Sequence, residues 1–172
     1  MENKILDKNF YKQDSVTVAK QLIGKILCVE KDNQIIRKRI IETEAYHGEN
    51  DTACHAHKGR TKRTEVMFHQ GGVTYIYLCY GMYDMLNVVT GEENFPDAVL
   101  IRGVDDYNGP GKLTKALGIT RKLNDWDLTA QEKIWIEDDG KKLKFHSDKR
   151  IGIRYASTKD QNRKWRFCAD LQ

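Results

Sequence analysis

A carboxylate, a histidine and several aromatic rings lie close together in the first half of the sequence. The carboxylate is Glu44 in the run Glu42-Thr43-Glu44-Ala45-Tyr46, the histidine is His55, and a cluster of tyrosines follows over residues 75–83. A carboxylate can take a proton from a water molecule, and aromatic rings stack on planar bases. These residue types therefore suit the binding of a planar ring and attack on a bond attached to it.

The relation between the acidic residues depends on the element that carries them. Side chains alternate between the two faces of a strand, so a strand would place Glu42, Glu44 and Tyr46 on one face. Taken alone, Glu-Thr-Glu is more simply interpreted as an edge strand with its polar face in water. At this point both Glu42 and Glu44 are candidates for the catalytic base, and Glu44 is the one that adjoins Tyr46.

The tyrosine cluster allows a similar pair of interpretations. Tyr75 and Tyr77 share one face of a predicted strand, where aromatic residues are ordinarily core or cross-strand partners. Tyr80 differs, because Gly81 can adopt a positive φ and turn its neighbour outward. A tyrosine at the tip of a loop suits insertion between stacked bases.

A loop rich in histidines and cations separates these two segments. Cys54, His55 and His57 carry metal-binding atoms, but residues this close together seldom complete a tetrahedral shell, and no second Cys/His pair follows. We therefore expect no metal ion and no organic cofactor. The cations of the loop are either a solvated surface or contacts to phosphate groups: Lys58, Arg60, Lys62 and Arg63.

Length and composition limit the classes of protein that fit. A chain of 172 residues with 40% apolar residues predicts one globular domain over residues 1–172. The net charge of +4 permits a polyanionic partner without requiring one. Four widely spaced cysteines without a Cys-x-x-Cys pair favour free thiols in a reducing cytoplasm. No apolar run is long enough to cross a bilayer, so no membrane partner is expected.

The order of predicted elements favours an α+β fold. Asp14 or Ser15 caps a predicted helix that ends at Gly24, and Pro110 begins another that ends at Gly118. Strands come in hairpin pairs, which predicts a mainly antiparallel sheet surrounded by short helices. The predicted strands cover Lys25 to Glu30, Gln34 to Tyr46, Thr74 to Leu78, Met85 to Thr90, Val99 to Arg102, Ile134 to Ile136 and Arg150 to Arg154.

An ordered series of motifs through nearly the whole chain resembles the alkyladenine (methylpurine) DNA glycosylases in their short bacterial form. Each motif alone is weak, but the series in this order is specific. The motifs are Arg39-Ile40-Ile41-Glu42-Thr43-Glu44-Ala45-Tyr46, Asp51-Thr52-Ala53-Cys54-His55, Gly59-Arg60-Thr61, Met67-Phe68, Tyr75-Ile76-Tyr77-Leu78-Cys79-Tyr80-Gly81-Met82-Tyr83, Leu86-Asn87-Val88, Val99-Leu100-Ile101-Arg102, Gly109-Pro110-Gly111-Lys112-Leu113 and Arg150-Ile151-Gly152-Ile153.

The resemblance implies a fold and a role for each matching residue. The family fold is a single mixed domain around a curved antiparallel sheet. By resemblance, Glu44 is the general base for a water molecule that Arg102 helps to position. The base-binding residues are Tyr46, His55, Tyr77 and Asn87, with Tyr80 intercalating into the duplex and Arg60 on the DNA backbone; Lys62 and Arg63 are further candidate backbone contacts.

The chain departs from the family pattern in two places. Lys62 and Thr64 stand where relatives commonly have proline and asparagine, which affects the loop expected to contact phosphates. Gly103 stands where alanine is usual, and we expect it to loosen the turn beyond the strand that carries Arg102.

The reaction that the resemblance implies is hydrolysis of an N-glycosidic bond in damaged duplex DNA. The expected lesions are 3-methyladenine, 7-methylguanine, hypoxanthine and ethenoadenine, and the expected enzyme is a monofunctional monomer in the bacterial cytoplasm. Cationic methylated bases need no acid to leave, so one ionised carboxylate suffices. No residue stands out as the acid that neutral bases would require.

Two alternatives from other classes stay open. One is a nucleic-acid-binding module without enzymatic activity. The other is a metal-dependent hydrolase that would use Glu44, His55 and His57. Release of a damaged base in the presence of a chelator, and its loss in Glu44→Gln, would separate both from the glycosylase.

Overall fold

Strand β3 (Gln34–His47) is the longest element of the computed structural model, which describes residues 2–172. It follows β2 (Ile26–Lys31) after a tight turn at Asp32 and Asn33, both of which have positive φ. Asp and Asn tolerate this left-handed conformation better than most residues. β2 and β3 therefore form the antiparallel hairpin that the sequence predicted.

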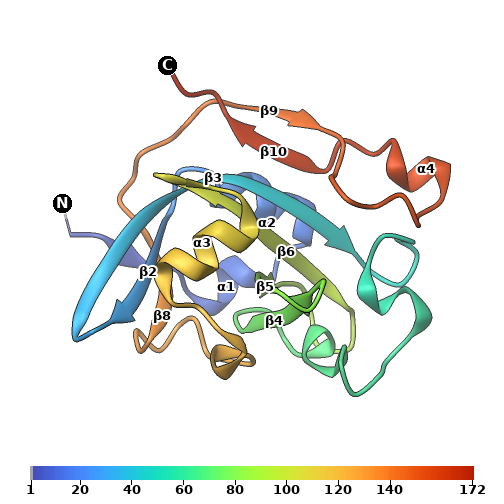
Figure 1. Cartoon of the computed structure of the whole chain (residues 1–172), viewed down its shortest axis with the longest axis horizontal. Helices are drawn as coiled ribbons and strands as arrows, with labels where there is room; N and C mark the ends of the chain where they lie inside the picture. Colours follow the sequence, from blue (N-terminus) through green and yellow to red (C-terminus); the bar gives the residue numbers. More distant parts are fainter. Residues whose placement is uncertain (1) are drawn as a thin grey trace.

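The strands form one antiparallel sheet that does not close on itself, in the order β1-β8-β2-β3-β6-β5-β4. β10 pairs with β3 and β9 outside this path, and β7 pairs with β6. Figure 1 shows β3 running from its hairpin with β2 past β6, with β9 and β10 beside it. The other strands are β1 (Lys4–Ile5), β4 (Thr74–Cys79), β5 (Tyr83–Val89), β6 (Asp97–Val104), β7 (Tyr107–Asn108), β8 (Ile134–Asp138), β9 (Phe145–Asp148) and β10 (Arg166–Ala169).

The second half of β3 is paired along both of its backbone edges. Glu44 lies opposite Leu100 of β6 on one side and opposite Arg166 of β10 on the other. The pairing with β6 shifts register between Ile40 and Thr43, as happens at a β-bulge, which bends a strand locally. Glu44 is thus held by two neighbouring strands just after a bend.

Helices are few and short, so the fold is α+β, as the sequence predicted. Among them, α2 (Ser15–Leu22) has Asp14 as its N-cap, and α3 (Pro110–Leu117) has Pro110 in its first turn. No helix within residues 2–172 has the length and apolar character needed to cross a membrane. The remaining helical segments are α1 (Lys8–Tyr11), α4 (Thr158–Gln161), η1 (His55–Lys58), η2 (Glu65–Phe68) and η3 (Arg121–Leu123).

One predicted strand is wrong. Residues 150–154 form bends and turns rather than a strand, and Gly152 has a φ of 76°. The Arg150 guanidinium is buried, and the Ile151 N–H donates to the Glu44 carboxylate instead of to a neighbouring strand. Side-chain contacts over a long sequence separation therefore override the apparent alternation of this segment.

The role expected for Gly103, to loosen a turn just beyond the strand of Arg102, is also wrong. Gly103 lies inside β6, which continues to Val104 and pairs there with β3 and β7. A Cβ atom at Gly103 would lie 3.3 Å from the Cβ of Glu42. The glycine therefore accommodates the close approach of β3 rather than loosening a turn.

Candidate active site

The two faces of the sheet have different surroundings. On one face, Ala45, Ile76 and Val99 enter the main core, which also contains residues of α2 and α3. On the other face, residues of the opposite parity line a cavity of about 590 Å³, a size typical of small-molecule sites. The strand residues among them include Tyr46, Tyr75, Tyr77, Asn87, Leu100 and Arg102.

Glu44 is fully buried directly behind the wall of this cavity. The Tyr46 hydroxyl donates to Glu44 Oε1 at 2.8 Å, and the Ile151 N–H donates to Oε2 at 2.7 Å. Arg102 Nη1 lies 3.6 Å from Oε1, which is longer than a direct hydrogen bond. The three groups that surround the carboxylate thus all belong to cavity-lining residues.

Burial raises the pKa of Glu44 above its ordinary value, because a charged carboxylate loses its hydration. Arg102, the Ile151 N–H and the Tyr46 hydroxyl act in the opposite direction. Two of the roughly four lone-pair positions of a carboxylate are occupied by these hydrogen bonds. A partly compensated carboxylate with free acceptor capacity is suited to act as a general base.

The structure separates Glu44 from its neighbour Glu42, which the sequence alone placed on the same face. Glu42 Oε1 accepts from Arg102 Nε at 3.2 Å and from Arg166 Nη1 at 3.2 Å. Neither glutamate lines the cavity itself. Three cavity-lining residues contact Glu44, namely Tyr46, Ile151 and Arg102, whereas only Arg102 among them contacts Glu42. Glu42 therefore orients the arginine, and the carboxylate next to the cavity is that of Glu44.

His55 and Tyr77 form one aromatic wall. Their ring centroids are 4.4 Å apart with an interplanar angle of 67°, so no planar base fits between these two rings. His55 Nδ1 lies 3.3 Å from the Tyr75 hydroxyl, which orients the imidazole from behind. Burial and the nearby Arg63 guanidinium lower the pKa of His55 to about 4, which keeps the ring neutral at physiological pH.

Asn87 lines the cavity and is buried within β5. Its amide Nδ2 donates to the Tyr75 carbonyl at 3.2 Å, across the β4–β5 pair. The side chain is therefore held in one orientation at the cavity wall, with its carbonyl oxygen outside this hydrogen bond.

Tyr80 projects from the tip of the β4–β5 hairpin, and 85% of its surface is exposed. Its φ of 53° and the φ of 65° at Gly81 are the combination found in type I′ turns, closed here by the Met82 N–H donating to the Cys79 carbonyl. Positive φ was expected at Gly81 but not at Tyr80. A bulky residue in this conformation is uncommon and costs energy, as is frequent at functional sites.

The candidate backbone contacts occupy two different places. Arg60 hydrogen-bonds Asn94 at 2.8 Å, pairs with Glu65 at 3.3 Å and packs over the Phe68 ring. Arg63 lines the cavity, with its guanidinium 5.5 Å from the Tyr77 ring centroid. Lys62 lies beside Arg63 in a second cleft along β4.

The histidines considered as metal ligands point to different partners. His57 Nδ1 lies 2.6 Å from the Glu49 carbonyl, and His57 does not line the cavity. Cys54 is a buried free thiol, and burial raises its pKa to about 12. Within residues 2–172, no three His, Cys, Asp or Glu side chains are grouped so that they would hold a metal ion.

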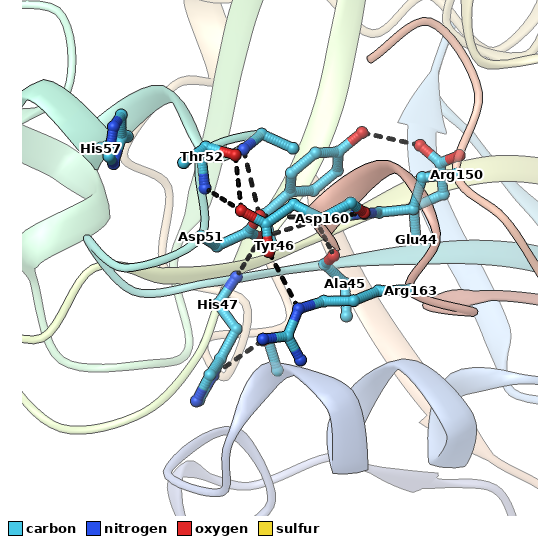
Figure 2. Close-up of polar contacts among 12 residues, drawn as sticks. Glu44, Ala45, Tyr46, His47, Asp51, Thr52, His57, Arg150, Asp160 and Arg163 are labelled. Atoms are coloured by element: carbon cyan, nitrogen blue, oxygen red, sulfur yellow. Dashed lines mark hydrogen bonds and ion pairs between the residues drawn. The ribbon is translucent and has the colours of Figure 1, made fainter. Parts of the chain in front are cut away.

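Several contributors to the site had no role in the sequence analysis. Arg150 and Asp51 form a buried ion pair, drawn in Figure 2 next to Glu44 and Tyr46. Ile151 supplies the N–H that binds Glu44, and Tyr155 lines the cavity with its hydroxyl on the Ala53 carbonyl at 2.7 Å. The only sequence signal for Asp51, Arg150 and Ile151 was their position within two of the family motifs. These motifs are Asp51-Thr52-Ala53-Cys54-His55 and Arg150-Ile151-Gly152-Ile153.

Comparison with known proteins agrees with the resemblance seen in the motifs. The model of the family described as Methylpurine-DNA glycosylase (MPG) matches residues 9–107 and 105–172. Proteins from Borreliella afzelii and Sodalis glossinidius, each named "Putative 3-methyladenine DNA glycosylase", are both 44% identical to this chain. The alignments cover 94% of both chains for the first and 97% of this chain and 98% of the relative for the second. A protein of the same name from Methanocella arvoryzae is 42% identical, over 95% of this chain and 91% of its own.

Proposed function

Because this chain belongs to the methylpurine-DNA glycosylase family, we propose that it is a monofunctional DNA N-glycosylase of base excision repair. It binds duplex DNA that contains an alkylated or deaminated purine, takes the damaged nucleotide out of the stack and hydrolyses its N-glycosidic bond. The products are the free base and an abasic site. The observation that carries the proposal is the buried Glu44 carboxylate, held against an aromatic cavity by Tyr46, Ile151 and Arg102.

The attacking water is held jointly by Glu44 and Arg102 in this proposal. Arg102 Nη1 is 3.6 Å from Glu44 Oε1, so a water molecule beside this pair can accept from the guanidinium while it donates to the carboxylate. Glu44 removes a proton from this water as the water oxygen attacks C1′ of the sugar. The N-glycosidic bond breaks, and its electron pair leaves with the base. The negative carboxylate also stabilises the positive charge that develops on the sugar.

Aromatic contacts offset the cost of extruding the base. Flipping costs a few kcal/mol, least for damaged or poorly paired bases, and stacking on an aromatic ring contributes roughly 1–3 kcal/mol per base. Tyr46 faces the bound base from one side, and His55 with Tyr77 forms the other side, since these two rings are in contact. Tyr80 fills the position that the base leaves.

The neutral state of His55 matters for substrates that carry positive charge. 3-Methyladenine and 7-methylguanine are cationic, so a protonated imidazole in the wall would repel them. A His55 pKa of about 4 avoids this repulsion. Both bases leave without protonation, and we therefore propose them as the preferred substrates over neutral hypoxanthine and ethenoadenine.

The proposal is tested with duplex DNA carrying 7-methylguanine, incubated with a chelator. The wild type is expected to release the base and to leave an unbroken strand until heat or alkali is applied. Glu44→Gln is expected to lose at least about 100-fold in single-turnover rate, the scale of a general base, while still binding the DNA. Glu93→Gln, an exposed glutamate outside the cavity, is the matched control and should keep wild-type activity.

Other outcomes would identify the alternatives. Loss of wild-type activity with the chelator would indicate a metal-dependent hydrolase. DNA binding without base release by the wild type would indicate a binding module. Strand cleavage without heat or alkali would indicate a lyase step with an amine nucleophile.

A further inference from the structure

We propose that a second cleft, along the free edge of β4, binds a phosphodiester group of the DNA strand whose base enters the cavity. The inference rests on the proposed function and extends it to a specific contact. The cleft has a volume of about 340 Å³ and is lined by residues that include Lys62, Arg63, Leu78, Arg121 and Asn124. Of these cleft residues, only Lys62 and Arg63 were expected from the sequence to contact the DNA backbone.

The free edge of β4 offers a backbone donor to this cleft. β4 is the last strand of the sheet, so alternate N–H groups point away from β5. The Thr74 N–H donates to the Trp126 carbonyl at 3.0 Å, and the Ile76 N–H donates to Asn124 Oδ1 at 2.8 Å. Leu78 continues this two-residue period, so its N–H points to the same edge.

The Leu78 N–H lies beyond the segment that covers the edge. Within residues 2–172, no loop carbonyl and no side chain accepts a hydrogen bond from it. An anionic oxygen in the cleft would accept from this N–H, as phosphates do from backbone N–H groups in many DNA complexes.

Three cations line the same cleft from two segments that are distant in sequence: Lys62 and Arg63 come from the loop after η1, and Arg121 comes from η3. Lys62 and Arg63 make no ion pair with any residue of the described chain. Arg121 Nε contacts Asp84 Oδ1 at 2.9 Å, and its side chain is 57% exposed. Asp84 contacts only the Nε atom, and an arginine has five N–H donors, so the Nη groups are left for a ligand. One carboxylate against three cations leaves the cleft positive.

The location of the cleft fits the strand that carries the extruded nucleotide. Arg63 and Tyr77 line both this cleft and the base cavity. Tyr80, at the hairpin tip, follows Leu78 by two residues. A phosphate bound at Leu78 therefore belongs to the backbone next to the gap that Tyr80 fills.

A phosphate in the cleft also resolves an electrostatic conflict. Arg63 stands over the Tyr77 ring at the border of the base cavity, where its charge would repel a cationic methylated base. An anion bound between Arg63, Lys62 and Arg121 offsets that charge at the moment the base enters. Arg60 lies outside this arrangement, since Glu65 and Asn94 already hold its guanidinium.

The first experiment measures how the affinity for lesion-containing duplex DNA depends on salt. The logarithm of the association constant falls linearly with the logarithm of the salt concentration. Removing one phosphate contact makes this fall shallower, with a slope smaller in magnitude by about 1, and weakens binding to all sequences. Arg121→Gln and Lys62→Gln are each expected to show this change. Lys142→Gln, a cation in a separate surface hollow near Lys20 and Phe145, is the control and should keep the wild-type slope.

The second experiment identifies the phosphate directly. Each phosphate near the lesion is replaced in turn by an uncharged methylphosphonate. The wild type should lose affinity at one position next to the lesion, and Arg121→Gln should show no further loss there while staying sensitive at other positions. Additive losses at every position, or an unchanged salt slope in Arg121→Gln, would overturn the assignment.

The two proposals fail in different ways. If the wild type releases damaged bases but Arg121→Gln behaves like Lys142→Gln, only the assignment of the cleft is wrong. If the wild type neither binds DNA nor releases a base, the proposed function is wrong and the cleft has no DNA to bind. Circular dichroism of each variant shows that the substitution leaves the fold intact.

Discussion

The guanidinium of Arg150 and the carboxylate of Asp51 form a fully buried, two-pronged ion pair, with N···O distances of 2.6 and 2.9 Å. The same guanidinium donates to the Ala45 carbonyl and lies 5.0 Å from the Tyr46 ring centroid. Figure 2 draws this pair beside Ala45 and Tyr46 of β3, and Asp51 belongs to the loop that follows the end of β3 at His47. One arginine therefore joins the strand of Glu44 to the loop that leads to His55.

We expect Arg150→Met to lower the free energy of unfolding by about 3–5 kcal/mol, because Asp51 would keep a buried charge without a partner. Urea unfolding measures the loss. Arg154→Met, four residues away and exposed, is the matched control and should change stability by no more than about 0.5 kcal/mol. Equal losses in the free energy of unfolding for the two substitutions would contradict this prediction.

The rate of base release should rise with pH through a pKa above 4.5, the ordinary value for glutamate, because burial raises the pKa of Glu44 and only the ionised form accepts a proton. Single-turnover rates on 7-methylguanine DNA between pH 4 and 8 would show this limb. A rate independent of pH over that range would contradict a titrating Glu44.

Glu44→Gln should be more stable than the wild type at neutral pH. A raised pKa in the folded state means that the contribution of Glu44 to stability is fully present below pH 4.5 and is lost as pH rises through the folded-state pKa. Glutamine carries no charge to desolvate, and its carbonyl oxygen can still accept from Ile151. Thermal unfolding should show the difference at pH 7 and a smaller one at pH 4; the reverse order would contradict it.

Two histidines should titrate on opposite sides of the ordinary value of 6.5. The hydrogen bond to Asp97 raises the pKa of His47, whereas burial and Arg63 lower that of His55 to about 4. A pH titration of the ring signals by NMR measures both residues in one sample. A His55 signal that titrates near pH 7 would contradict the neutral aromatic wall.

Tyr80→Asn should raise stability and lower activity together. Asparagine adopts the positive φ of this turn more easily than tyrosine, so about 1 kcal/mol of strain is relieved. Loss of the ring removes stacking of roughly 1–3 kcal/mol per base and weakens binding to damaged duplex. Unfolding curves and binding isotherms test the two effects. Met82→Asn, exposed at the same tip but without positive φ, should not gain stability.

Much of the sheet could be predicted because several local signals agree within each hairpin. The turn at Asp32 and Asn33, the proline that opens α3 and Gly118 at its end are all found where expected. The alternation of β3 also predicted that Glu44 and Tyr46 share a face, and their hydrogen bond confirms it. Period and turn chemistry are short-range properties, which a sequence displays directly.

The contacts that distinguish the site residues are long-range and could not be predicted in this way. Glu42 and Glu44 look equivalent in the sequence, and only Arg102 and Arg166 show that Glu42 is already paired. The segment beginning at Arg150 resembles a strand because its isoleucines alternate, yet its buried guanidinium dictates another conformation. Arg121 gave no signal at all, since its cleft exists only once η3 lies beside β4.

The hydrogen bond between Ile151 and Glu44 also sets an order of events during protein synthesis. The two residues are 107 positions apart. At roughly 5–20 residues per second, translation delivers Ile151 several seconds after Glu44. β10, which pairs with β3 at Glu44, follows later still. An unfinished chain on the ribosome therefore already contains the residues of the aromatic wall but lacks the N–H that hydrogen-bonds Glu44, so the proposed site is complete only after Ile151 has been added.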